Sequence, residues 1–300
     1  MEECTVPRNV FGKQCFGDLN IPTGPKCRQV CEAAVALGYK LLALNTPVVA
    51  TSCLPQKVGG GGKKGKKRKL EEKTGGILSA TAAQTGQDGV PPAKRPAWIE
   101  ELMEKHKDVR ILQRLTVIFY DINHLQTVLS QENVASYDIL AVVPTNHDAL
   151  VSCVISSLVF DIITFDIEGP HWIKKVKLNM QKGKVAAEKD VYFEITYSPS
   201  FHGDEPLENM IYIGDRVRED ICTRKIKNVV ISSGASAPDE LRCPQNVLGI
   251  GYLLGFDETT TRICIREHVQ KIASKGDSRK FGKSWVAFTP NEQEKEKAEV

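Results

Sequence analysis

The chain has 300 residues, with 40 Lys and Arg against 37 Asp and Glu, and a formal net charge of +3. This near-balance excludes a histone-like or uniformly basic nucleic-acid binder, but the charge is unevenly distributed. Residues 57–96 carry ten basic and three acidic side chains, so the rest of the chain has a net charge of −4. The sequence therefore predicts a slightly acidic body that carries one strongly basic segment.

Hydropathy and cysteine content indicate an intracellular protein without a membrane partner. The longest apolar stretch, residues 149–160, is too short and too often interrupted by serine to span a bilayer. The amino terminus lacks the basic and apolar regions of a secretory signal. Nine scattered cysteines, an odd number, suggest reduced and mostly buried thiols, and hence a cytosolic or nuclear address.

Short runs rich in β-branched and aromatic residues alternate with amphipathic segments along the chain. The expected strands are 16–21, 41–44, 115–120, 139–143, 160–165, 192–197 and 229–231. The expected helices are 26–37, 97–106, 147–158, 171–181, 211–225, 247–255 and 258–273. Repeated βα units predict a parallel sheet with right-handed crossovers. About seven units over roughly 250 residues favour a closed, TIM-barrel-like α/β fold over an open doubly wound sheet.

The segment at residues 55–96 breaks this alternation and is expected to be a disordered insert. It contains nine of the 23 glycines and has no periodic apolar face to bury. We expect residues 1–54 to form the first βα units, 55–96 the basic insert, 97–273 the remainder of the barrel, and 274–300 a charged, loose tail.

A basic run within the insert has the composition of a nuclear import signal. Its charged residues are Lys63, Lys64, Lys66, Lys67, Arg68 and Lys69. Direct contact with RNA or DNA, through release of counterions from phosphate, is an alternative interpretation. A solvated linker is a third.

Three patterns that are suggestive of cofactor or metal chemistry are better explained by packing. Cys27 and Cys31 lie on one apolar helical stripe, so we expect core packing rather than a zinc site. The glycines at 249, 251 and 255 lie within an apolar helical stretch instead of a strand-to-helix turn, which favours close helix packing over a dinucleotide loop. The six histidines are isolated, without an HxH or HExxH pattern, which weighs against a metallohydrolase.

Polar residues on the strands offer two further candidate sites. Ser232 and Ser233 close the last strand, where barrel enzymes often hold a phosphate; an ordinary polar exit from the strand explains them equally well. Asp161 and Glu194 could act as an acid–base pair. We favour structural hydrogen bonds from these carboxylates to barrel arginines such as Arg114.

Two basic clusters lie on the later helices. One includes Lys174 and Lys175, and the other includes Arg216 and Arg218. Such faces are usually only solvated. On a net-negative body, however, they are also candidates for phosphate contact.

The strand motifs together resemble one known family, the TIM-barrel-like 30-kilodalton protein subunit of eukaryotic and archaeal ribonuclease P. The matching segments, in order, are 16–20 (FGDLN), 37–39 (LGY), 43–45 (ALN), 111–116 (ILQRLT), 137–141 (YDILA), 193–199 (FEITYSP), 228–233 (NVVISS) and 240–247 (ELRCPQNV). Their order and spacing agree with the family from about residue 15 to 275, apart from the basic insert. No single segment is decisive, but the series is specific.

The resemblance implies an accessory, non-catalytic protein without a cofactor or bound metal. The family is similar in fold to metal-dependent phosphoesterases of the polymerase-and-histidinol-phosphatase type, which carry HxH at the end of the first strand. Here Asp18-Leu19-Asn20-Ile21 stands there instead. In ribonuclease P the RNA subunit cuts the 5′ leader from precursor tRNA, and proteins support the RNA. A phosphoesterase with atypical ligands is the alternative function.

The resemblance also implies partners and a location. The expected partners are ribonuclease P RNA, precursor tRNA, and other ribonuclease P and ribonuclease MRP proteins, especially a small ferredoxin-like subunit. The expected location is the nucleus and nucleolus. Arg114 and Arg242 match basic positions of the family, as candidates for RNA contact or for a salt bridge at the barrel rim, whereas Asp18, Glu194 and Ser233 are expected to maintain the barrel. The full set of candidate RNA-binding residues is Arg114, Lys174, Lys175, Arg216, Arg218, Ser232, Ser233 and Arg242.

Overall fold

A computed structural model describes residues 15–50, 89–169, 174, 179–220 and 228–281. The basic run at 63–69, Lys175 and most of the helix expected at 171–181 lie outside the described residues. Within the described part, no helix is long and apolar enough to cross a membrane.

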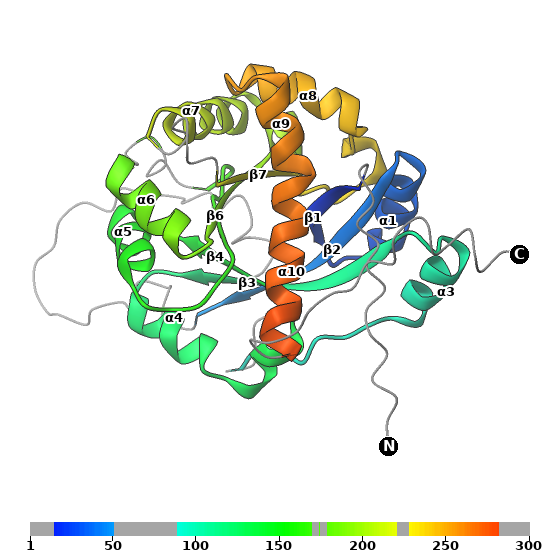
Figure 1. Cartoon of the computed structure of the whole chain (residues 1–300), viewed down its shortest axis with the longest axis horizontal. Helices are drawn as coiled ribbons and strands as arrows, with labels where there is room; N and C mark the ends of the chain where they lie inside the picture. The colour runs from blue at the N-terminus through cyan, green and yellow to red at the C-terminus, as the bar shows by residue number, and fades with distance from the viewer. Residues whose placement is uncertain (1–14, 51–88, 170–173, 175–178, 221–227, 282–300) are drawn as a thin grey trace, which may run out of the picture.

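Seven parallel strands, paired in chain order, form a nearly closed barrel with helices around it (Figure 1). They are β1 (Phe16–Pro22), β2 (Tyr39–Val49), β3 (Arg110–Phe119), β4 (Ile139–Pro144), β5 (Ile162–Thr164), β6 (Tyr192–Thr196) and β7 (Val229–Ser232). The outer helices are α1 (Cys27–Ala36), α3 (Ala97–Lys105), α4 (Ile122–Leu129), α5 (His147–Ile155), α6 (Met180–Glu188), α7 (Asp204–Asp220), α8 (Pro244–Leu253) and α9 (Glu258–Ile265). The expected barrel of about seven βα units is confirmed.

The two edge strands close the barrel through loop contacts. β1 and β7 lie side by side. The Gly234 amide donates to the Asn20 carbonyl at 2.9 Å, and the Ser233 amide donates to the Asp18 carboxylate at 3.0 Å. A glycine suits this turn because its φ is +67°, a conformation that side chains strain. These bonds satisfy backbone groups that an open sheet edge would leave unpaired.

A final helix, α10 (Glu267–Phe281), lies across the amino ends of the strands (Figure 1). Its Val269, Ile272 and Ala273 pack with inward-facing strand residues in one buried cluster. A Cβ atom at Gly276 would lie 2.1 Å from the Asp138 carbonyl, so this helix backbone packs directly against the start of β4. α10 therefore closes one end of the barrel.

Two expectations near the carboxyl end are corrected. The helix expected at 258–273 is divided into α9, which ends at Ile265, and α10, which begins at Glu267. Residues 274–281, expected to begin a loose tail, continue α10 to Phe281, and residues 282–300 of that tail lie outside the described residues. Residues 274–281 have a charged sequence, but Arg110 at the start of β3 pairs with Asp277, and Arg279 pairs with Asp161 just before β5 at 3.0 Å. These long-range ion pairs hold the last two turns, and a sequence pattern does not reveal them.

Other boundaries also differ from expectation. β3 begins at Arg110 instead of residue 115, and α7 begins at Asp204 instead of residue 211. Residues 89–96, expected within the insert, include Val90, which is buried and whose amide donates to the Gln131 side chain at 2.7 Å. The packed chain thus resumes before residue 97, because single buried contacts fix a segment that has no periodic pattern.

Candidate functional site

A buried ion pair lies at the centre of the barrel. The Arg114 side chain from β3 meets the Glu194 carboxylate from β6 in a two-pronged contact, with N–O distances of 2.6 and 2.7 Å. Both side chains are 0% exposed. The expected hydrogen bonding between Glu194 and Arg114 is confirmed.

Three further side chains join this pair into a ring of hydrogen bonds. Arg114 Nε donates to Thr116 Oγ1 at 3.0 Å, and Thr116 Oγ1 donates to Asn45 Oδ1 at 2.6 Å. Asn45 Nδ2 donates to Asn20 Oδ1 at 2.8 Å, and Asn20 Nδ2 donates to Glu194 Oε2 at 3.3 Å. Because buried polar groups are stable only when paired, this ring is a structural element of the barrel interior.

The burial of Arg114 corrects one expectation for the site. A guanidinium that is wholly inside the barrel and paired with Glu194 does not reach an RNA on the surface. Of its two expected roles, RNA contact or a salt bridge, the structure supports the salt bridge. The salt bridge between Arg114 and Glu194 lies inside the barrel rather than at its rim.

Asp18 lies beside the ring and supports the β1–β7 closure. Its Oδ1 accepts hydrogen bonds from the amides of Asn20 and Ser233. Burial raises the pKa of Asp18 to about 6, although the bonds from Ser233 and Asn20 oppose that shift. The expectation that Asp18 and Ser233 maintain the barrel agrees with these contacts.

The same contacts argue against a phosphate site at the end of β7. The Ser233 and Gly234 amides donate to Asp18 and Asn20, and Ser233 Oγ accepts from the Ala235 amide at 3.1 Å. Ser232 and Ser233 are 1% and 0% exposed. Since the Ser233 and Gly234 amides are used within the fold and both hydroxyls are buried, these contacts favour the ordinary exit from the strand for the two serines.

Asp161, expected to bond an arginine such as Arg114, has different partners. It precedes β5 at the amino end of the barrel, where it accepts from the Leu140 amide and pairs with Arg279 and Lys275 of α10. Asp161 and Glu194 therefore lie in separate ionic networks and form no acid–base pair.

The exposed basic residues of the later segments are mostly neutralised by neighbouring acids. Lys174 pairs with Glu208 at 2.9 Å. Arg216 and Arg218 both contact Asp215, and both contact Glu219 on the next turn of α7. Within the described residues, this part of the expected basic cluster is thus a set of local ion pairs, the solvated alternative, with little charge left for phosphate.

Cys27, Cys31 and Gly251 are placed as the packing interpretation predicts. Both cysteines are buried in the apolar cluster between α1 and the barrel. A Cβ at Gly251 would lie 2.0 Å from Thr261 Oγ1, so this glycine permits close contact between α8 and α9.

Arg242 is partly exposed and lies close over an aromatic ring without an acidic partner, whereas Arg216 lies 5.9 Å from the Tyr212 ring and is paired with Asp215. Its guanidinium carbon lies 4.5 Å from the centre of the Phe201 ring, which is 45% exposed. Phe201 belongs to the short helix η3 (Ser198–His202) after β6, and Arg242 follows η4 (Pro238–Glu240) after β7. Phe201 was not predicted from the sequence; an aromatic residue in the loop after a strand of a βα fold was the available signal.

A histidine beside Phe201 connects three loops at the carboxyl ends of the strands. His202 Nδ1 lies 2.7 Å from Glu168 Oε1, and its Nε2 lies 3.3 Å from Glu240 Oε1. Hydrogen bonds to Glu168 and then to Glu240 raise the pKa of His202. Because a carboxylate accepts but does not donate, both contacts are satisfied only by the doubly protonated ring.

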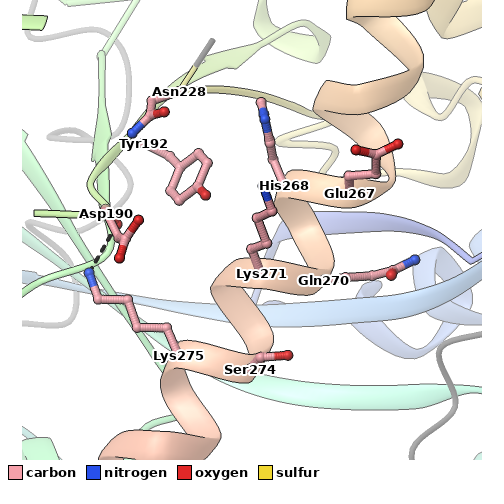
Figure 2. A pocket seen from close by; sticks show the side chains of 9 residues that line it. All are labelled: Asp190, Tyr192, Asn228, Glu267, His268, Gln270, Lys271, Ser274 and Lys275. Atoms are coloured by element: carbon pink, nitrogen blue, oxygen red, sulfur yellow. Dashed lines mark hydrogen bonds between the residues drawn. The ribbon is translucent and has the colours of Figure 1, made fainter. Parts of the chain in front are cut away.

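A separate cavity of about 630 Å³ lies at the amino end, between α10 and the starts of β6 and β7. Figure 2 shows Tyr192 opposite the side chains of α10, with Asp190 and Lys275 at one side. The Lys275 amine donates to the carbonyls of Phe160, Lys189 and Asp190. Its charge is therefore used to cap backbone groups, and the cavity presents mixed charges instead of a set of groups that converge on one ligand.

Comparison with known proteins places this barrel in a family. The family described as RNase P subunit p30 matches residues 15–281. The mouse ribonuclease P protein subunit p30 is 27% identical over 277 residues, which cover 88% of this chain and 87% of the relative. The ribonuclease P protein subunit drpp30 of Dictyostelium discoideum is 24% identical over 184 residues, or 61% of this chain and 47% of the relative.

A solved structure shares the fold. A chain in the cryo-EM structure of archaeal ribonuclease P with mature tRNA superposes with a TM-score of 0.56 at 12% identity, covering 92% of this chain and 99% of that one. The family match spans every strand of the barrel and ends at the last residue of α10. The chain belongs to the RNase P subunit p30 family.

Proposed function

We propose that this chain is a protein subunit of ribonuclease P, the ribonucleoprotein that removes the 5′ leader from precursor tRNA. The observation that carries the proposal is the family match over residues 15–281, which includes the whole barrel and the helix that closes it. The mouse relative, matched over most of both chains, supports it.

In this proposal the chain supports cleavage and does not perform it. The residues at the centre of the barrel bond one another: Glu194 is neutralised by Arg114, and both oxygens of its carboxylate are occupied. The groups that an active site would direct at substrate are used here to hold strands together. No observation in the described residues favours the alternative, a phosphoesterase with atypical ligands.

The proposed partners are ribonuclease P RNA, precursor tRNA and other ribonuclease P proteins, including a small ferredoxin-like subunit, with ribonuclease MRP as a second assembly. The archaeal ribonuclease P structure, one chain of which shares this fold, contains mature tRNA, and this supports a role in a tRNA-processing particle. The proposed location is the nucleus and nucleolus, with residues 63–69 as the import signal.

An affinity pulldown tests membership of the complex. The tagged full-length chain is recovered from an extract of its own cells, and the bound fraction is assayed for ribonuclease P RNA and for 5′ cleavage of precursor tRNA. We expect both, and we expect nuclease treatment of the bound RNA to abolish cleavage. Absence of that RNA from the bound fraction would refute the proposal.

Two further measurements test the non-catalytic role of the chain and the import role of residues 63–69. The purified chain, without RNA, is expected to leave precursor tRNA and a generic phosphoester intact in Mn²⁺; hydrolysis by the chain alone would support the enzyme alternative. Removing residues 63–69 is expected to abolish nuclear accumulation of a fluorescent fusion while recovery of the partner subunits is unchanged. Normal accumulation would leave the basic run without an import role.

A further inference from the structure

Arg242 is distinguished from the other described arginines by its uncompensated charge. Each of the others has a carboxylate within 4.0 Å, as Arg262 has in Glu258. Arg242 Nη1 donates instead to the backbone carbonyls of Asp239 and Leu241, both at 2.8 Å. Its full positive charge and its Nη2 and Nε donors remain available at a partly exposed position.

The Phe201 ring beside Arg242 adds a second kind of recognition surface. The ring is 45% exposed, and its contact with the guanidinium at 4.5 Å places an apolar face next to a cation. Tyr197 lies behind it, with ring centres 6.0 Å apart. An exposed aromatic ring next to an arginine is the combination on which unpaired nucleobases stack while the adjacent phosphate is neutralised.

This pair is held rigidly by buried groups. The Arg242 amide donates to the Tyr197 hydroxyl at 3.1 Å, and its carbonyl accepts from the Tyr39 hydroxyl at 2.8 Å. Glu240 connects η4 to η3 by accepting from Ser198 Oγ at 2.7 Å. A site that is already ordered loses little conformational entropy on binding, so even two contacts can contribute measurable affinity.

The neighbouring carboxylates do not pair with the positive charge of Arg242. Glu168 and Glu240 both contact His202, whose protonated ring offsets one of their two negative charges, and neither carboxylate lies within 4.0 Å of the Arg242 guanidinium. A protein carboxylate would satisfy Arg242 but would not use the exposed face of Phe201, and an apolar side chain would use Phe201 but not the charge. A nucleotide offers a phosphate and a stacking base on one unit.

We infer that Arg242 and Phe201 form an RNA-docking platform on the loops after β6 and β7, where Arg242 binds a backbone phosphate and Phe201 stacks an unpaired base. The inference deepens the proposed function and rests on it. The platform places RNA contact at the carboxyl end of the barrel, opposite the end that α10 covers.

The test uses the full-length chain and a fluorescein-labelled, mixed-sequence single-stranded RNA of about 20 nucleotides, with affinity measured by anisotropy over a range of salt concentrations. Phe201→Leu is expected to weaken binding roughly tenfold without changing the salt slope, because it removes stacking only. Arg242→Gln is expected to weaken binding and to reduce the salt slope by about one, because it removes one phosphate contact. Phe201→Trp is expected to restore affinity.

The control variant is Arg262→Gln, because this exposed arginine is already paired with Glu258; its affinity should equal that of the unmodified chain. Circular dichroism must show that all variants are folded. The platform would be overturned if the unmodified chain failed to bind the probe, or if the Phe201→Leu and Arg242→Gln variants bound it as tightly as the unmodified chain. Variants that keep RNA affinity but lose a protein subunit in the pulldown would identify a protein site instead. Recovery of ribonuclease P RNA by the unmodified chain decides the proposed function separately.

Discussion

The sharpest test of the barrel interior is the substitution Arg114→Met. It removes the partner of Glu194 but keeps most of the side-chain volume. Glu194, which is 0% exposed, then retains one side-chain donor, Asn20 Nδ2 at 3.3 Å. Leaving a buried charge uncompensated typically costs about 3–5 kcal/mol. That loss is about a fifth or more of the stability of about 5–15 kcal/mol that is usual for a domain.

The second variant, Glu194→Gln, and the double variant complete a thermodynamic cycle. Gln retains an acceptor for Asn20, so the double variant contains no unpaired charge. We expect it to be more stable than Arg114→Met by about 2 kcal/mol or more, because the penalty of the unpaired carboxylate disappears. Arg262→Met is the matched control, since its ion pair with Glu258 is half exposed and such pairs contribute only about 0.3–0.5 kcal/mol.

Urea unfolding followed by circular dichroism measures all four variants. A loss below about 1 kcal/mol for Arg114→Met would refute the reasoning, because it would show that water or another cation reaches Glu194. Simple additivity of the two single variants would refute it independently, since directly bonded residues are expected to couple.

Two other predictions follow from the packing of α8 and from the loop histidine. Gly251→Ala should lower the free energy of unfolding by about 1–3 kcal/mol, because the new Cβ atom would meet Thr261. Gly249 faces open space on the same helix, so Gly249→Ala should raise the free energy of unfolding by about 0.5–1 kcal/mol. Equal urea midpoints for the two variants would contradict this prediction. His202 should titrate above its ordinary pKa of 6.5 by NMR, and Glu240→Gln should lower that pKa. Because the pKa of His202 is raised in the folded state, its contribution to stability is present below the unfolded-state pKa and is lost as the pH rises through the folded-state pKa. A measured pKa at or below 6.5 would contradict the doubly protonated ring.

The barrel could be predicted because its strands are buried on both faces. Runs such as 139–143 and 229–231 are apolar almost continuously, and each is followed by a helical pattern, so periodicity and order were sufficient to predict seven parallel strands. The pairing of Glu194 with Arg114 was also predicted, because a charge within an apolar strand needs a partner of opposite sign.

The site could be predicted only in part, since exposure depends on long-range packing. Arg114 and Arg242 look alike in the sequence, as basic residues within two segments typical of the family. The fold places the first inside the barrel with Glu194, and it places the second on the surface against Phe201, 41 positions away in sequence. The sequence alone therefore could not distinguish an arginine in a buried ion pair from an exposed arginine that is a candidate for RNA contact.

The order of apolar runs indicated the architecture, the series of family-typical segments indicated the family, and the count of charged residues indicated the uneven charge, because each of these depends on neighbours along the chain. The closure of the barrel by α10, the use of Ser233 to join β1 to β7, and the free charge of Arg242 depend on residues that are distant in sequence. Ion pairs and hydrogen bonds form according to distance in space, so these features appear only once the chain is folded.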